Sequence, residues 1–222
     1  MFHMDFGFPR GTTFSAKDET GSLITSIDGN WAYLLIIDRK TRYIWVVIVK
    51  NKQAPCKAVG KFLETHDRKT GQRVIQTNKG RELWGSLQTW ETVHQAHYLM
   101  ELTAPGAPFQ NGMAECPNQT LANYMWCMLN GANLGPEFWP HALTHAIQIY
   151  NMIPHSVTNT LLQLNREAPY YRVATCFGCR YYARKLGDGS HKLDYNTSTG
   201  IFLGFAATAK NFYYYDTETA RK

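Results

Sequence analysis

Residues 103–121 read Thr-Ala-Pro-Gly-Ala-Pro-Phe-Gln-Asn-Gly-Met-Ala-Glu-Cys-Pro-Asn-Gln-Thr-Leu. Prolines and glycines fill the first part of this stretch, which predicts a loop. Pro117 suits the first turn of a helix, because the N–H groups there have no partner within the helix. From Leu121 onward the apolar residues recur at helical spacing. The stretch therefore predicts a loop that runs into a helix, with the carboxylate of Glu115 at the junction. Taken alone, such an acid is usually a helix cap or a partner of the helix dipole.

The chain before this stretch alternates between strand-like and helix-like segments. Two apolar runs separated by residues 38–41 predict a β-hairpin, and their continuous apolar character favours central, buried strands. The expected strands are residues 3–6, 23–27, 31–37, 43–49, 73–77 and 96–102, and the expected helices start near 55, span 83–94, follow Glu115 and span 136–153. This order predicts a mixed α/β sheet with helices packed against it.

The composition changes near the end of the chain. Residues 154–173 are polar with little periodicity and are expected to form a linker. Residues 174–222 contain many aromatic side chains and three short strand patterns, at 180–183, 200–205 and 211–215. We expect a large α/β domain over residues 1–153 and a small all-β unit over 174–222.

The bulk composition limits the classes of protein. No stretch reaches 18 apolar residues, which argues against a transmembrane helix, and the first residues lack the pattern of a secretory signal. The five cysteines have no framework spacing, which favours a reducing, intracellular compartment. The formal net charge of +6 permits an anionic partner such as nucleic acid but does not require one.

Three polar positions are expected to meet at one edge of the sheet. Asp5 lies on the first strand, Asn78 directly follows the strand at 73–77, and Glu115 lies at the expected helix start. Three carboxylates in such places would hold two Mg²⁺ ions and support phosphoryl transfer on nucleic acid. Acids at strand ends are common, however, and position 78 carries an amide.

Several motifs, in order along the chain, resemble the integrase of copia-type LTR retrotransposons. The motifs of the catalytic core are residues 3–7 (HMDFG), 33–45 (YLLIIDRKTRYIW), 75–82 (IQTNKGRE), 111–115 (NGMAE) and 138–142 (FWPHA). Residues 176–179 (CFGC), 192–194 (KLD) and 200–205 (GIFLGF) resemble the SH3-like segment that follows the core in these polyproteins. The resemblance covers nearly the whole chain.

The resemblance implies an RNase H-like fold followed by an SH3-like unit. It implies that Asp5, Asn78 and Glu115 occupy the metal-binding catalytic positions, with Mg²⁺ or Mn²⁺ as cofactor. It further implies DNA partners (the element ends and the target), a homo-oligomer, a nuclear location and no membrane association. The reactions implied are 3′-end processing and DNA strand transfer. The candidate nucleic-acid contacts are Lys79, Asn111, Gln119, Arg180 and Lys185.

Two residues depart from the family pattern. Asn78 stands where the family has Asp, so one oxygen ligand remains but a unit of negative charge is lost. Cys116 stands where the family usually has Arg after the catalytic Glu. These departures predict low or absent activity, and the alternative function is a non-catalytic nucleic-acid-binding or assembly relic that keeps the fold.

Two further patterns have simpler readings. Cys176 and Cys179 have the spacing of half a zinc site or a redox pair, but no second pair completes it, and packing explains Cys179. His141 and His145 are one helical turn apart and are expected on the helix surface.

Overall fold

The computed structural model describes residues 1–10, 22–50, 55–66, 74–77, 85, 87, 98–103, 108–153, 175–184, 197–206 and 211–217. Nearly all of the helix expected over 83–94 and the linker expected over 154–173 lie outside these ranges. Asn78, Lys79 and Lys185 also lie outside them.

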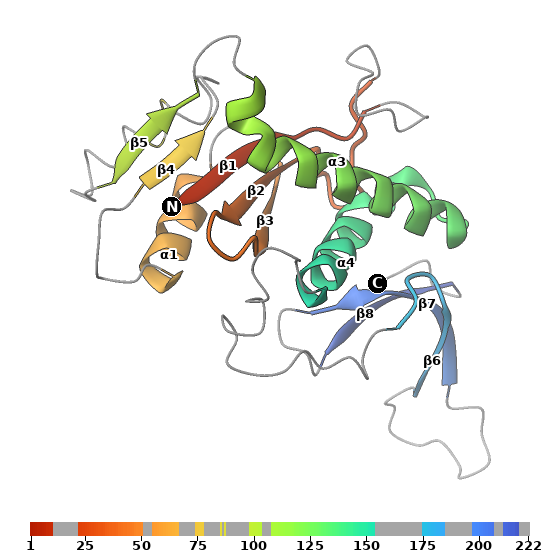
Figure 1. The fold of residues 1–222 in the computed structure, drawn as a ribbon. Coiled ribbons are helices and arrows are strands. Elements are labelled where there is room, and N and C mark those ends of the chain that lie inside the picture. The colour runs from red at the N-terminus through yellow and green to blue at the C-terminus, as the bar shows by residue number, and fades with distance from the viewer. Residues whose placement is uncertain are drawn as a thin grey trace.

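A five-stranded mixed sheet organises the N-terminal part (Figure 1), in the order β3-β2-β1-β4-β5. Strands β1, β2 and β3 pair antiparallel, whereas β1, β4 and β5 pair parallel. The short connection from β2 to β3 allows an antiparallel hairpin, whereas the parallel neighbours need longer crossovers. The mixed α/β class and the central place of β1 are confirmed. The strands are β1 Phe2–Gly7, β2 Ala32–Asp38, β3 Ile44–Val49, β4 Val74–Thr77 and β5 Leu99–Leu102.

Helices cover both faces of this sheet. Helix α1, Cys56–His66, packs on one face, where Leu34 and Ile36 of β2 point. Helices α3, Pro108–Gly131, and α4, Trp139–Met152, pack on the other face, where Leu35 and Ile37 point. Because both faces are covered, β2 is apolar along its length.

Two strand predictions need correction. Strand β3 lies at the sheet edge, and four of its six residues are only partly buried, although its apolar run predicted a central position. Residues 23–27 form no strand, only a single bridge between Leu23 and Arg10. A tight turn replaces the rest, because Ser26 O accepts Gly29 N–H and Ser26 Oγ accepts Asn30 N–H.

Helix α3 begins earlier than predicted. Its first residue is Pro108, which suits the first helical position. Pro117 therefore lies inside the helix, and Glu115 lies in its second turn. The helix continues past Pro117 despite the lost backbone hydrogen bond, because residues on its buried face, including Ala114, Leu121 and Met125, join the core.

A second, three-stranded antiparallel sheet packs on α4 (Figure 1). It contains β6 Arg180–Arg184, β7 Thr197–Phe205 and β8 Phe212–Asp216, so the expected small all-β unit is present. Leu203 of β7 joins the same core as Trp139 of α4. The 3₁₀ turn η1, Pro136–Phe138, leads into α4.

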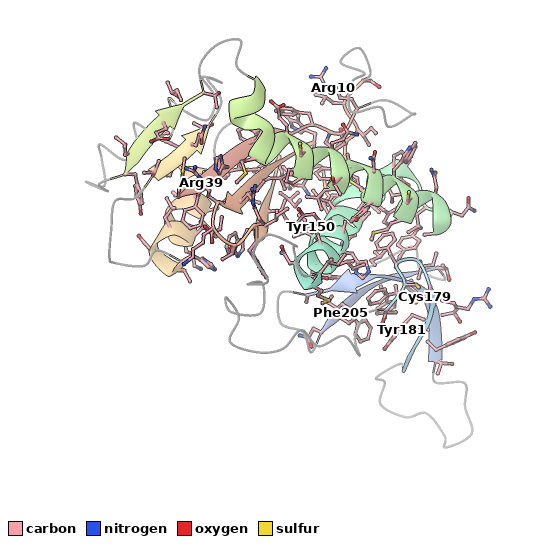
Figure 2. The ribbon with its side chains drawn as sticks, viewed as in Figure 1. Arg10, Arg39, Tyr150, Cys179, Tyr181 and Phe205 are labelled. Carbon is pink, nitrogen blue, oxygen red and sulfur yellow. The ribbon has the colours of Figure 1, made fainter. Side chains whose placement is uncertain are left out.

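The expected surface position of His145 is wrong. Its side chain is only 2% exposed and lies against Phe177, Phe202 and Phe205. Figure 2 marks Phe205 and Tyr181 on this second sheet. Helical spacing along α4 could not place His145 in the core, because residues far along the chain provide the aromatic neighbours.

Asn151, near the end of α4, hydrogen-bonds the backbone of the edge strand β3. Its amide donates to Ile44 O at 2.8 Å, and its Oδ1 accepts Ile44 N–H at 2.9 Å. We expect Asn151→Ala to lower the free energy of unfolding by about 1–3 kcal/mol, because both backbone groups lose their partner. Urea denaturation measures this loss. Asn123→Ala, on the exposed side of α3, is the matched control, and an equal loss in both variants would contradict the bridging role.

Candidate functional site

Asp5 lies in the middle of the central strand β1, opposite Leu35 of β2. Side chains alternate along a strand, so Asp5 shares its face with His3 and Gly7. This is the face that α3 crosses (Figure 1). Only 7% of Asp5 is exposed, so the fold places a carboxylate where little water can solvate its charge.

Glu115 reaches this region from the second turn of α3, and its own side chain is exposed. Its negative charge acts on Asp5. The structure thus brings together two of the three predicted acid positions, from segments that are far apart in the sequence.

The environment raises the pKa of Asp5 from 3.8 to about 6. Burial is the largest cause, and the charge of Glu115 raises the pKa further. Hydrogen bonds from the Phe6 backbone and the Asn118 side chain act in the opposite direction, because they stabilise the carboxylate. A cation between the two acids would compensate for the lost hydration of the Asp5 carboxylate and for its repulsion by Glu115. The chemistry of the two acids therefore fits a divalent metal.

The described part of the chain holds no group of three His, Cys, Asp or Glu side chains placed to bind a metal. Of the three predicted metal-binding positions, the described residues include only Asp5 and Glu115. Asn78, the third predicted position, lies outside the described residues, but its neighbour Thr77 is buried at the end of β4 and pairs with Met4, directly before Asp5.

A chain of polar side chains that the sequence analysis missed supports Asp5. Tyr33 Oη donates to Asn118 Oδ1 at 2.6 Å, and the Asn118 side chain hydrogen-bonds Asp5. Burial, and then the charge of Asp5, raises the pKa of Tyr33, so its hydroxyl remains protonated as a donor. Asn118 follows Glu115 by three residues and therefore shares its helix face, which is the signal that could have identified it.

Gly7 leaves the space that the Tyr33 ring occupies. The two residues are opposite each other on β1 and β2, and a Cβ atom at Gly7 would overlap the ring and hydroxyl of Tyr33. Because Tyr33 is buried, the ring has little room to move.

We expect Gly7→Ala to lower the free energy of unfolding by about 1–3 kcal/mol, the usual cost of overpacking. The double variant Gly7→Ala/Tyr33→Leu should lose less than the sum of the two single variants, because the smaller side chain removes the overlap. Urea denaturation of all four proteins measures this coupling. Strict additivity would show that Gly7 is not needed to make room for Tyr33.

The predicted nucleic-acid contacts are spread over the molecule. Gln119 is exposed on α3, one turn after Glu115, and donates to Asn123 Oδ1 at 3.3 Å. Asn111 belongs to the first turns of α3. Arg180 is exposed on β6 in the second sheet, which lies beyond α4 from β1 (Figure 1). The structure therefore brings Gln119 near the acids but not Arg180.

The cysteines of the second unit are free thiols. Cys176 is exposed, and Cys179 is partly buried close to it. Burial is the main cause that raises the pKa of Cys179. No metal group includes them among the described residues.

Three curated relatives match most of the chain. The retrovirus-related Pol polyprotein from transposon TNT 1-94 of Nicotiana tabacum is 30% identical over 190 residues, or 82% of this chain. Those from transposons RE1 and RE2 of Arabidopsis thaliana are 26% and 24% identical, over 92% and 86% of this chain. Over most of its length, the chain is similar to the Pol polyproteins of copia-type retrotransposons. It spans 14%, 14% and 13% of the length of these three relatives. No protein-family model matches it.

A solved structure supports the integrase-like fold of the chain. A chain of the simian T-cell lymphotropic virus intasome, in complex with PP2A regulatory subunit B56 gamma, aligns with a TM-score of 0.52. The alignment covers 94% of this chain and 73% of that chain, at 12% identity. The expected RNase H-like, integrase-like fold is confirmed. None of the helices in the described ranges is long and apolar enough to cross a membrane.

Proposed function

We propose that this chain is a retroelement integrase catalytic domain that binds DNA and whose catalysis is impaired at Asn78. The observation that carries the proposal is the pair of acids on β1 and α3, where the charge of Glu115 acts on the buried carboxyl of Asp5. A buried acid whose pKa is raised by burial and by a second, nearby acid is typical of sites that bind cations or perform catalysis.

Asp5 and Glu115 would hold Mg²⁺ or Mn²⁺ through hard oxygen ligands, with Asn78 as the third and weakest position. When bound, such ions activate an attacking oxygen and stabilise the leaving oxygen of a phosphodiester. Burial limits the access of water to Asp5, and Asn118 orients its carboxylate. Tyr33 in turn fixes the Asn118 amide, because its hydroxyl donates to Oδ1.

DNA would approach from the exposed side of α3. Gln119, one turn after Glu115, is the proposed contact near the acids. The other proposed contacts are Asn111, Lys79, Arg180 and Lys185. The same proposal includes two domains, over residues 1–153 and 174–222. It also includes a homo-oligomeric assembly and a nuclear location.

The second candidate function is a non-catalytic nucleic-acid-binding or assembly module. The residue at position 78 favours it, because an amide cannot supply the charge of the family's Asp. Both candidate functions include DNA binding, but only the first includes catalysis of strand transfer.

A paired assay separates them. DNA binding is measured by fluorescence anisotropy over a range of salt concentrations, and strand transfer is measured on the same DNA with Mg²⁺ and with Mn²⁺. Binding with measurable strand transfer supports the impaired enzyme, whereas binding without transfer in either metal supports the relic. A chain that folds but does not bind DNA contradicts both.

A further inference from the structure

A cavity lies at the start of β1, where it is lined by His3, two residues before Asp5. Its volume is about 380 Å³, and its lining includes His3, Arg39, Arg42, Gln76 and Glu101. Arg39 and Arg42 come from the hairpin between β2 and β3, and Gln76 is paired with His3 across β1 and β4. Figure 2 shows Arg39 close to the start of β1.

The two guanidinium groups in this cavity have weak partners. Arg39 Nη1 contacts Met1 Sδ at 3.0 Å, and Arg42 Nη1 contacts Met113 Sδ. A thioether sulfur is a poor hydrogen-bond acceptor. Within the described ranges, neither guanidinium forms an ion pair. The described residues therefore offer these guanidinium groups only weak acceptors, which leaves their N–H groups available to an anion.

His3 provides an independent sign that a ligand is missing. Its side chain is 3% exposed, yet neither ring nitrogen has a hydrogen-bond partner among the described residues. A buried polar group without a partner is costly, so it calls for an explanation such as a bound ligand. His3 lines the same cavity as the two arginines.

The charges of the lining select an anion. Two arginines outweigh the single carboxylate of Glu101, and the guanidinium fork matches the oxygens of a phosphate. His3 and Asp5 are two residues apart on the same face of β1, a separation of about 7 Å along the strand. A DNA strand that runs along this face could therefore place one phosphate in the cavity while a nearby phosphodiester lies at the acids.

We propose that this cavity binds a backbone phosphate of the DNA strand that reacts at Asp5 and Glu115. Arg39 and Arg42 bind the phosphate oxygens, and an imidazole N–H of His3 donates to one of them from the buried side. The site anchors the strand and fixes which phosphodiester lies at the acids. This inference rests on the proposed function, because it takes DNA as the ligand.

The test measures DNA affinity against salt, without a metal or turnover. We expect Arg39→Gln and Arg42→Gln each to weaken binding about five- to tenfold and to reduce the salt slope by about 0.9, the value for one lost phosphate contact. Lys40→Gln is the matched control, because Lys40 is exposed in the same hairpin and does not line the cavity. It should leave the slope unchanged. An RNA duplex of the same sequence, measured in parallel, tests the assignment of DNA as the ligand.

A second measurement locates the phosphate. Duplexes with one neutral methylphosphonate at successive positions from the 3′ end should reveal one position that weakens binding by the original chain but not by Arg39→Gln/Arg42→Gln. If these arginine variants bind like Lys40→Gln, or if no position is coupled to the arginines, the subsite is refuted while the proposed function remains. Tighter binding of RNA refutes the DNA assignment. Failure of the folded original chain to bind DNA refutes the proposed function and the subsite together.

Discussion

Asn78→Asp is expected to raise Mg²⁺-dependent strand transfer by at least about 100-fold over the original chain. The substitution restores a charged ligand, and interactions with a metal contribute several kcal/mol to transition-state stabilisation. Each 1.36 kcal/mol changes a rate about tenfold, so about 3 kcal/mol corresponds to this gain. DNA affinity should change little. The measurement is the initial rate of strand transfer at saturating DNA.

Two matched variants control this experiment. Asn130→Asp makes the same chemical change at an exposed position near the far end of α3 and should not restore activity. Glu115→Gln in the Asn78→Asp protein should remove the gain, because the restored acid acts together with Glu115. If the original chain already matches Asn78→Asp, our interpretation of Asn78 is wrong. If the folded, DNA-binding Asn78→Asp protein transfers nothing, Asn78 is not the main lesion, and Cys116 becomes the next residue to revert.

Asp5→Asn is expected to stabilise the protein above pH 6 while removing metal-dependent activity. The folded state raises the pKa of Asp5 from 3.8 to about 6, so it binds this proton more tightly than the unfolded chain does. The stability from the protonated form is therefore fully present below pH 3.8 and is lost as pH rises through about 6. The change in pKa corresponds to about 3 kcal/mol, and Asp5 is too buried for solvent to screen much of it.

Urea denaturation on both sides of pH 6 measures this effect. The difference in unfolding free energy between Asp5→Asn and the original chain should grow with pH toward about 3 kcal/mol. Glu64→Gln, on the exposed side of α1, removes a charge without burial and should show little pH-dependent difference. Mn²⁺ should stabilise the original chain more than Asp5→Asn, because a bound ligand stabilises the folded state. A difference between Asp5→Asn and the original chain that does not change with pH would contradict the burial argument.

Local sequence signals predicted most of the elements that the structure describes. The hairpin formed because two apolar runs flank a short polar turn, and α4 ends at Met152, two residues before Pro154. Local signals placed the start of α3 incorrectly, because Pro117 favours a helix start, whereas packing of the buried face of α3 holds it inside the helix. The local signals also predicted that β3 is a central strand. An apolar run does not show whether a strand has a partner on one side or on both sides.

Part of the candidate site could likewise be predicted from the sequence, and part of it could not. Asp5 and Glu115 were identified from motif order, which is a property of the sequence. The Tyr33–Asn118 hydrogen bond joins residues 85 positions apart, and no local pattern predicts such a contact. The cavity around His3 likewise needs β1, β4, β5, the hairpin and α3 together.

The sequence by itself determined the family, the order of the elements and the identity of the residue at position 78, because these depend on residue type and spacing alone. Only the tertiary structure decided that Glu115 acts on a buried Asp5, that Tyr33 and Asn118 orient it, and that His3, Arg39 and Arg42 line one cavity. The physical reason is that burial and charge interactions depend on distance in space, and chain folding sets those distances through contacts between remote segments.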